Sequence, residues 1–335
     1  MSGIFTLDLS GDAARAENFF SDSEKKATIE AGRIRAAYWI GEARKAQNLD
    51  PRDALTRAAR VPLSYYGMLA REAFQQNQIN LRSAPEPDFD RASGDQLFQA
   101  IVLLLDADAG DFVTPLAGDF IQRAPDAPTL AALAALGASY RDLRLVTIAG
   151  KAAQQKNYGF DFENWPIDGF PLPDNPPLER ALIYAITRQE SSFDPNAISP
   201  AGARGLMQLM VATAQETAKK ANITFAAEKL TGDPAYNVTI GSTHLAELVE
   251  DWGGSYCLAI ASYNAGKGNV RRWIAANGDP REKSIDPVRW VEKIPVTETR
   301  IYVQRVMENL QIYRARLEGR NTTTLIDDMK RGASL

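Results

Sequence analysis

The amino-acid sequence predicts an all-α fold. Through most of its 335 residues, apolar side chains recur three or four positions apart, as they do along one face of a helix. No segment alternates apolar and polar residues over more than four or five positions, which is the pattern that a half-buried strand would show. The hydrophobic content of 45% allows a sizeable core, spread over at least two domains.

Residues 12–80 are expected to form short helices in succession. Helical patterns cover 27–47 and 65–74, and Asp50 followed by Pro51 is a helix-start signal between them. Short amphipathic helices joined by tight turns are typical of helical-hairpin arrays, in which each pair packs on the next. We therefore predict a helical-hairpin, superhelical region over residues 1–82.

Residues 83–170 are predicted to form a helical linker domain and a connector. A proline-containing break at 83–88 opens this part, and the Ala-rich run 130–138 indicates a closely packed helix. The stretch 157–177 contains five prolines, which is typical of an extended connector. The helices expected before that connector cover 96–106, 112–123, 129–136 and 143–155.

Residues 171–320 are predicted to form a compact helical domain, followed by a C-terminal tail at 321–335. Asn175 is expected to cap a helix that begins at Pro176. The helices expected in this domain cover 176–191, 205–221, 234–252, 255–264, 268–277, 286–293 and 297–317.

Composition excludes several classes of function. The formal net charge is -4 with both signs interspersed, which gives no electrostatic support for a nucleic-acid partner. One Cys (Cys257) and one His (His244) are too few for a zinc or iron–sulfur site, so we expect both to pack among apolar neighbours and predict no cofactor and no metal. No apolar run approaches the roughly 18 residues of a membrane span. The first ten residues lack a signal-peptide pattern, which leaves the compartment open.

Glu190 is the most informative single residue. It follows Leu178, Leu182 and Ile186 at a spacing of four, so it falls on the apolar stripe of its own helix. Partial burial there would favour the neutral carboxyl and raise its pKa. A carboxylic acid that stays protonated near neutral pH can donate a proton to a leaving oxygen, as glycoside cleavage requires. The alternative is a glutamate that ends the stripe and reaches water.

Four segments in the second half of the chain favour a catalytic role for Glu190. They are Glu190-Ser191-Ser192-Phe193, Gly205-Leu206-Met207-Gln208, Ser262-Tyr263-Asn264-Ala265-Gly266 and Thr297-Glu298-Thr299-Arg300. Their order and spacing resemble the catalytic domain of the soluble lytic murein transglycosylases, which have a goose-lysozyme-like fold and cleave peptidoglycan. The resemblance covers roughly residues 178–318, and the segment from Tyr65 to Ala70 resembles the end of the superhelical region in large members of that family.

The resemblance implies a reaction with one catalytic carboxyl. Glu190 would protonate the glycosidic oxygen between N-acetylmuramic acid and N-acetylglucosamine. It would then accept the proton of the muramoyl C6 hydroxyl as that oxygen closes on C1 to give a 1,6-anhydro product. Tyr263 would orient Glu190 or the reacting sugar. Asp194, which precedes a proline at the helix end, is expected to form a turn and not to act as a second acid.

The same resemblance implies a set of substrate-binding residues. Ser199 would contact the lactyl or peptide group of muramic acid, and Gln208 would hold substrate acyl or hydroxyl groups. Met207 and Met210 are three residues apart and are expected to share a helical face, as core packing or, for Met210, as an apolar wall of the sugar groove. The remaining members of the set are Asn264 and Glu298.

Several of these residues have alternative roles. Asn264 can fix the backbone at a helix end, and Glu298 can complement the dipole of the helix that it begins. Trp252, Trp273 and Trp290 are expected in the core although tryptophan can stack on sugars. The sequence departs from the family at Ser262, Val211 and Lys267, where the family usually has Ala, Pro and Pro.

Three functions compete at this point. The first is a lytic transglycosylase with peptidoglycan strands as its partner, which the resemblance implies and which belongs in the periplasm. The second is a lysozyme-like hydrolase on the same scaffold, although no second acid stands near Glu190 in the sequence. The third is a non-catalytic murein-binding scaffold, for which a protonated glutamate has no use.

Overall fold

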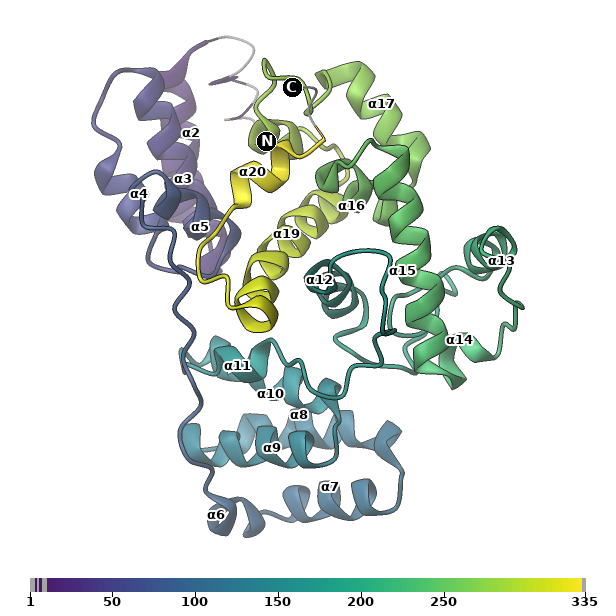
Figure 1. The fold of residues 1–335 in the computed structure, drawn as a ribbon. Helices are drawn as coiled ribbons and strands as arrows, with labels where there is room; N and C mark the ends of the chain where they lie inside the picture. The colour runs from purple at the N-terminus through teal and green to yellow at the C-terminus, as the bar shows by residue number, and fades with distance from the viewer. Residues whose placement is uncertain (1–3, 5, 8–10, 333–335) are drawn as a thin grey trace. The chain divides into compact units, whose positions relative to one another are not determined.

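The computed structural model describes residues 4, 6, 7 and 11–332, and this part of the chain is built from helices (Figure 1). Within it, the only strand-type pairing consists of isolated bridges such as Gln78 with Thr322. The all-α prediction is therefore confirmed. Most of the first ten residues, where the signal-peptide pattern was sought, lie outside the described residues.

The chain divides into two compact units that are described separately. Unit 1 comprises Met1–Ile79, Leu245–Ala315 and Arg320–Leu335, and unit 2 comprises Asn80–His244 and Arg316–Gly319. The sequence-based boundaries at 82, 170 and 320 are different from these, because contacts between segments distant in the sequence define the units.

Unit 1 combines N-terminal helical hairpins with helices from the end of the chain. Among the described residues its helices are α2 (Ala13–Lys26), α3 (Glu30–Ala46), α4 (Arg52–Ala58), α5 (Tyr65–Glu72), α16 (Tyr256–Ala265), α17 (Lys267–Asn277), α18 (Pro287–Glu292) and α20 (Leu325–Lys330), with most of α19 (Thr297–Glu318) and the end of α15 (Pro234–Asp251).

Unit 2 contains the predicted linker helices and the helix that carries Glu190. Among the described residues its helices are α6 (Phe89–Ser93), α7 (Gln96–Asp106), the 3-10 turn η2 (Gly110–Phe112), α8 (Val113–Arg123), α9 (Ala127–Ser139), α10 (Leu143–Gln155), α11 (Asp161–Asn164), α12 (Arg180–Ser191), α13 (Val211–Lys220) and α14 (Lys229–Gly232), with the start of α15.

Helices α7 to α10 form a layer around one apolar core. The Ala-rich helix α9 lies inside it, since Leu130 and Leu133 are fully buried and its apolar residues extend all round the helix. Asp126 and Asp142 cap α9 and α10 by accepting backbone N–H groups at 3.0 and 2.9 Å. The close-packed helix predicted for 130–138 is confirmed.

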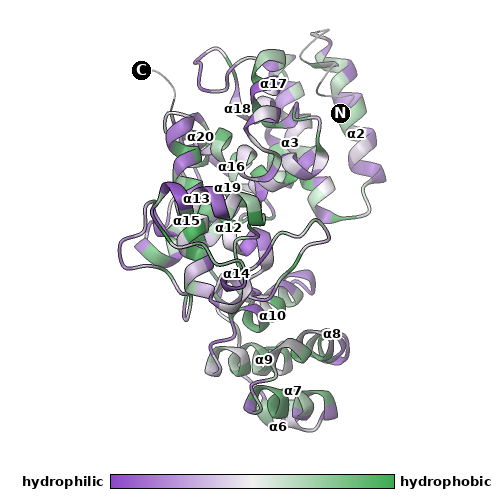
Figure 2. Cartoon of the chain, turned by 90° about the vertical axis from the view of Figure 1, so that its right-hand side faces the viewer, coloured by the Kyte–Doolittle hydropathy of each residue, from purple (hydrophilic) through white to green (hydrophobic). Residues whose placement is uncertain are grey.

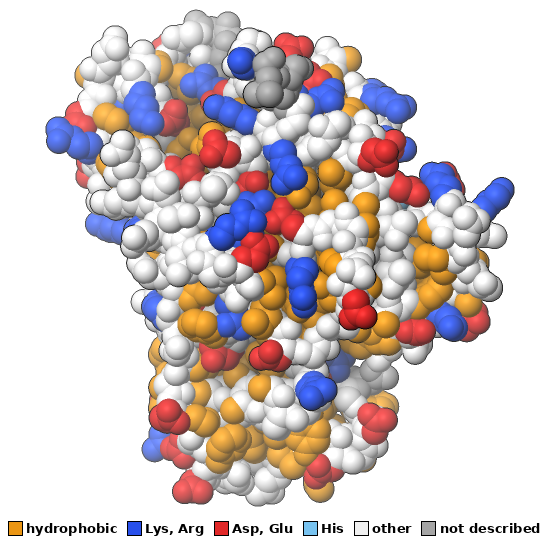
Figure 3. Space-filling view, in the orientation of Figure 1, with side chains coloured by type: hydrophobic (Ala, Val, Ile, Leu, Met, Phe, Trp, Pro, Cys, Tyr) orange, Lys and Arg blue, Asp and Glu red, His pale blue; other side chains and the backbone are white. Residues whose placement is uncertain are grey.

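Helix α7 is only half covered by this layer. Phe98 and Ile101 are buried, whereas Leu103 is 68% exposed although the helix is almost entirely apolar. Figure 2 shows hydrophobic residues on α7 in green, and Figure 3 shows hydrophobic side chains at the surface over α7 and α9.

The predicted start of the helix that carries Glu190 is wrong. The helix expected to start at Pro176 with Asn175 as its cap begins instead at Arg180, because residues 176–179 continue the extended connector. The connector packs on α12 through Phe170, whose ring lies 4.4 Å from that of Tyr184, and the Tyr184 hydroxyl donates to the Ile167 carbonyl.

The predicted C-terminal tail contains a docked helix. Leu325 and Met329 of α20 are 0% and 1% exposed, and Arg314 pairs with Asp328 across α19 and α20 at 3.0 Å. The Tyr65 hydroxyl contacts the Met329 sulfur at 3.0 Å, which joins α20 to α5. Buried apolar side chains and a buried ion pair therefore attach residues 325–330 to unit 1.

A buried carboxylate joins the N-terminal hairpins to the end of the chain within unit 1. Glu292, at the end of α18, is 2% exposed and accepts two hydrogen bonds from Arg35 of α3, with Nε 2.9 Å from Oε1. The Tyr66 hydroxyl of α5 and the Gln304 amide of α19 donate to the same oxygen. Burial alone would raise the pKa of Glu292, but the hydrogen bonds and charge of Arg35, with Tyr66 and Arg300, lower it.

A close helix contact predicts one large effect on stability. A Cβ at Gly150 of α10 would lie 2.3 Å from the Asn164 backbone nitrogen of α11, so Gly150→Ala is expected to destabilise the protein by about 1–3 kcal/mol. Gly118→Ala on α8 is the control, because a Cβ there meets nothing within 4 Å and alanine favours helix. Urea unfolding of the two variants measures the difference, and equal midpoints would contradict the tight contact.

The lowered pKa of Glu292 predicts a pH dependence of stability. A depressed carboxyl contributes stability above its unfolded pKa of about 4.3 and loses it as pH falls through its lower folded pKa. Glu292→Gln should therefore lower the unfolding midpoint strongly at pH 7 and much less at pH 3. Thermal scans across this range test it, with the exposed Glu282→Gln as a control that changes the midpoint at neither pH.

Candidate active site

Glu190 lies in the last turn of α12, and the chain reverses directly after it. Its side chain is half-buried, as expected for the end of an apolar stripe whose Leu182 and Ile186 are fully buried. Ser192 and Phe193 follow with φ of 54° and 66°, a left-handed conformation that costs about 1–2 kcal/mol per non-glycine residue. Phe193 is 2% exposed, and its burial offsets that strain.

Several contacts fix this reversal in unit 2. The Ser191 hydroxyl donates to the Leu206 carbonyl at 2.8 Å, which ties the first motif to the second. Lys151 of α10 donates to the Ser192 hydroxyl. Arg188, one turn before the helix ends, donates to the Asn164 carbonyl at 2.9 Å and lies over the Trp165 ring. Glu190 is therefore carried by a segment that is anchored on both sides.

Asp194 has the turn-forming role predicted for it. Its carboxylate accepts the Asn196 backbone N–H at 3.0 Å and lies 3.4 Å from the Arg144 guanidinium. Arg144 also donates to the Gly110 carbonyl at 2.6 Å. The mostly buried guanidinium of Arg144 thus attaches the loop after Glu190 to the helical layer of unit 2.

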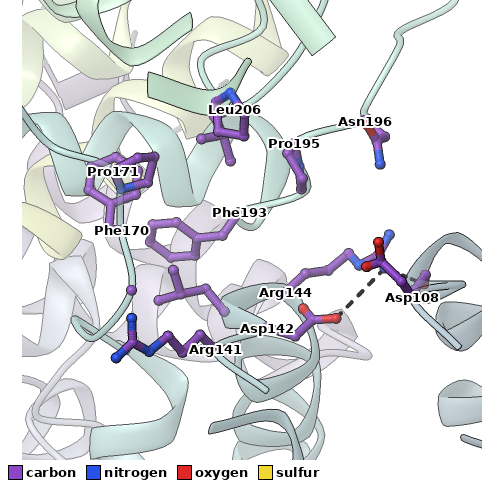
Figure 4. A pocket seen from close by; sticks show the side chains of 14 residues that line it. Asp108, Arg141, Asp142, Arg144, Phe170, Pro171, Phe193, Pro195, Asn196 and Leu206 are labelled. Carbon is purple, nitrogen blue, oxygen red and sulfur yellow. Dashed lines mark hydrogen bonds and ion pairs between the residues drawn. The ribbon is translucent and has the colours of Figure 1, made fainter. Parts of the chain in front are cut away.

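A cavity of about 550 Å³ lies beside this loop. Figure 4 shows the rings of Phe170 and Phe193 in its wall, with Arg144 and Asp142 at another part of the lining. Leu206 of the second motif also lines it. Polar contacts here stabilise the loop, and the volume falls within the range of small-molecule sites.

The second motif forms a turn and not the start of a helix. The helix predicted over 205–221 begins only at Val211, because Gly205 and Gln208 have φ of 74° and 45°. A Cβ at Gly205 would lie 2.0 Å from the Leu230 carbonyl oxygen, so this position requires glycine. Gln208 Nε2 donates to the carbonyls of Ala197 and Gly205 at 3.0 and 2.9 Å.

The two methionines do not share a helical face. Met207 is fully buried in the turn, and a Cβ at Gly241 of α15 would meet its sulfur at 2.5 Å, whereas Met210 is 46% exposed. The helical-face prediction is wrong because the turn rotates the two side chains apart. Ser199 is half-buried, and its hydroxyl accepts the Ala203 N–H at 3.0 Å.

Asn237 is the residue that sequence reasoning missed. This fully buried side chain of α15 accepts the Met207 N–H at 2.9 Å and donates to the carbonyls of Arg204 and Leu230 at 2.9 and 2.8 Å. It therefore gives the buried Met207 N–H of the turn an acceptor and ties the turn, through Arg204, to Leu230 of α14. The sequence contains no clear signal for it, because the same helix carries other polar residues, among them Thr239, Ser242 and Thr243.

The third and fourth motifs meet in unit 1. Tyr263 and Asn264 are half-buried at the end of α16, where Gly266, with φ of 80°, ends the helix as predicted. The Thr299 hydroxyl donates to Asn264 Oδ1 at 2.6 Å, which joins α16 to the first turn of α19. Glu298 in that turn is exposed, so both roles weighed for it remain open.

The departures from the family pattern have local explanations. Ser262 is buried, and its hydroxyl accepts the indole N–H of Trp252 at 2.7 Å. Val211 and Lys267 are the first residues of α13 and α17, a position that proline also fits. The family's prolines are therefore replaced where the helix geometry does not require them.

The remaining predicted core residues are buried. Trp252, Trp273 and Trp290 are at most 8% exposed, and Cys257 is fully buried, which raises the pKa of its thiol to about 12. His244 is half-buried. Within residues 4, 6, 7 and 11–332, no group of three or more His, Cys, Asp and Glu side chains is arranged to hold a metal ion. In the same residues, no helix combines the length and apolar character of a membrane span.

The fold and the motifs define an all-α protein with a lysozyme-like helical domain, and comparison with known proteins agrees. Residues 174–285 match the family model of the Transglycosylase SLT domain. A soluble lytic murein transglycosylase of Escherichia coli K12 is 40% identical over 138 residues, which cover 41% of this chain and 21% of that protein. Residues 174–285 therefore form a domain similar to the Transglycosylase SLT domain, and the chain shares this region with soluble lytic murein transglycosylases.

Solved structures extend the likeness to nearly the whole chain. An inactive mutant of lytic transglycosylase Slt from Pseudomonas aeruginosa matches 98% of this chain with a TM-score of 0.79 and 26% identity. The 70 kDa soluble lytic transglycosylase of Escherichia coli matches 99% with a TM-score of 0.78 and 23% identity, which shows the fold. The matched part is 53% of each of those chains, so this chain spans about half the length of these relatives.

The buried hydrogen bonds of Asn237 predict a loss of stability when its side chain is removed. Asn237→Ala removes the acceptor of the Met207 N–H and a donor to the carbonyls of Arg204 and Leu230, of which Arg204 keeps its bond from the Leu209 N–H, so we expect a loss of about 1–3 kcal/mol. Thr239→Ala on the same helix removes one local hydroxyl contact to the Ala235 carbonyl and should change stability by no more than about 0.5 kcal/mol. Denaturant titration distinguishes them, and a small effect for Asn237→Ala would show that the turn forms without it.

Proposed function

We propose that this protein is a peptidoglycan lytic transglycosylase that cleaves the β-1,4 bond between N-acetylmuramic acid and N-acetylglucosamine. The observation that carries the proposal is the SLT domain match at 174–285, within which Glu190 ends α12 beside the anchored Gly205–Gln208 turn. The relatives that span more sequence than this chain are named for the same reaction on murein.

In the proposed mechanism, Glu190 acts first as an acid and then as a base. Its carboxyl proton passes to the glycosidic oxygen, and the bond from that oxygen to the muramoyl C1 breaks. The carboxylate then takes the proton of the C6 hydroxyl while that oxygen bonds to C1, which gives a 1,6-anhydro ring and restores protonated Glu190. Because the nucleophile belongs to the substrate, the reaction consumes no water and needs no second catalytic carboxyl.

The supporting residues are assigned in two groups. Tyr263 is proposed to orient Glu190 or the sugar, with Asn264 and Glu298 at the groove. Ser199 and Gln208 are proposed to bind the substrate from the loop and turn after Glu190. Met210 offers exposed apolar surface to a sugar ring, whereas Met207 offers none, so the apolar wall is assigned to Met210.

The substrate indicates where the protein works. Peptidoglycan lies outside the cytoplasmic membrane, so we propose the periplasm as the compartment and glycan strands as the binding partner. The single buried cysteine, Cys257, is compatible with an oxidising compartment because it has no exposed thiol to react.

Loss of the acid tests the proposed reaction. Digestion of purified murein should release muropeptides with 1,6-anhydro ends, and Glu190→Gln should lower their rate of formation by about 10²–10⁴-fold because the amide cannot donate a proton in this way. The exposed Glu250→Gln on α15 is the matched control and should retain full activity. Mass spectrometry decides, since products heavier by one water would identify a hydrolase, and unchanged murein from the wild type would leave only a binding role.

A further inference from the structure

A series of polar contacts, centred on the buried Glu292, leads through unit 1 from the N-terminal helix α3 to the first turn of α19. It begins at Glu292, which Arg35 holds through two hydrogen bonds and to which Tyr66 and Gln304 also donate. The carboxylate side chain is 1% exposed, whereas that of Arg35 is 34% exposed. Paired N–H donors on a buried carboxylate fix both its position and its orientation.

Arg300 extends these contacts to the corner between α18 and α19. Its guanidinium lies 4.0 Å from Glu292 Oε2. From there Nη1 donates to the Ile294 carbonyl at 3.0 Å and Nη2 donates to the Thr297 hydroxyl at 3.3 Å. The corner of residues 293–297 is therefore held from its inner side by a charge that Glu292 balances.

Thr299 links the corner to the third motif. Its side chain is buried, and its hydroxyl donates to Asn264 Oδ1 at 2.6 Å. Asn264 directly follows Tyr263 at the end of α16. The contacts thus lead from Arg35, which lies outside the matched family domain, to the segment that carries the proposed orienting tyrosine.

We propose that Arg35 and Glu292 are positioning residues for catalysis. They hold the corner of residues 293–297 and, through Thr299 and Asn264, the end of α16 that carries Tyr263. The inference rests on the proposed function. It gives the N-terminal helices α3 and α5 a part in the reaction, although they contribute no residue to the four motifs.

The physical chemistry of the pair favours positioning over simple stabilisation. Desolvating a carboxylate and a guanidinium offsets much of their attraction, so a buried ion pair is weak evidence for stability as such. An apolar pair could fill the same volume but could not also orient Arg300. The guanidinium of Arg300 donates to one backbone acceptor, the Ile294 carbonyl, and to one side-chain acceptor, the Thr297 hydroxyl. The Glu292 carboxylate therefore lies where the corner of residues 293–297 must adopt one geometry.

The first test compares two arginines of α3. Arg35→Gln should lower kcat for anhydromuropeptide release by about 10- to 100-fold, the range expected when a reacting group is misplaced by about an ångström. KM should change less than kcat, because Ser199, Gln208 and Met210 are untouched and only Asn264 and Glu298 of the proposed binding residues lie on the affected segments. Arg35→Lys should recover part of the loss, and the exposed Arg33→Gln should behave as wild type.

Amide hydrogen exchange of the same variants separates positioning from general loosening. Arg35→Gln should speed exchange in residues 293–300 and 262–266, where the contacts lead, and leave α20 unchanged. Arg33→Gln should change neither. Equal acceleration throughout unit 1, or normal kcat in Arg35→Gln, would overturn the proposal.

A second variant tests the far end of the same contacts in case Arg35→Gln does not fold. Thr299→Val keeps the shape of the side chain but removes the donor to Asn264, so kcat should again fall by about tenfold or more with an unchanged unfolding midpoint. Thr147→Val is the matched control, because its buried hydroxyl has no hydrogen-bond partner to lose among residues 4, 6, 7 and 11–332. Wild-type activity in Thr299→Val would refute the link to Asn264.

The two proposals fail in different ways. If wild-type protein releases no anhydro product, the proposed function is wrong, whatever the exchange data show. If the wild type is active, Glu190→Gln is inactive and both Arg35→Gln and Thr299→Val turn over normally, the function stands and the positioning role is wrong.

Discussion

The hydrogen-bonded ion pair of Arg35 with Glu292 is the interaction on which the arrangement of unit 1 depends. These residues are 257 positions apart in the sequence, and their contact joins an N-terminal helix to the turn before α19. Because the carboxylate is almost fully buried, it is stable as a charge only with its donors in place. Removing either partner would leave an uncompensated charge, so the pair requires α3, α5, α18 and α19 to keep one relative geometry.

In unit 2, the segment around Glu190 is held in place by a different kind of interaction. There the chain around Glu190 is irregular, with left-handed residues at Ser192, Phe193 and Gln208. Neutral hydrogen bonds from buried side chains, above all Asn237, satisfy the backbone that this irregularity leaves open. Strain of this kind persists only where the surroundings determine it, and such sites are enriched at functional centres.

Most helices were predictable because they are long and strongly periodic, as α7, α10 and α19 show. The candidate catalytic segments were also predictable, since Glu190 and Tyr263 belong to short motifs whose order is characteristic. The errors fell where local signals conflict with tertiary packing. Asn175-Pro176 has the form of a helix start, yet the helix begins at Arg180, and Gly205–Met210 has helical spacing, yet two positive φ angles make it a turn.

The sequence by itself determined the all-α class, the resemblance of residues 178–318 to a catalytic domain and the identity of the proposed acid, because hydrophobic periodicity and motif order are properties of neighbouring residues. Only the tertiary structure decided that Arg35 binds Glu292, that Asn237 supports the second motif, and that residues 325–330 dock as a helix. Each of these rests on a buried polar or apolar group whose partner is distant in the chain. Burial makes such pairing obligatory, but it does not reveal the partner until the chain is folded.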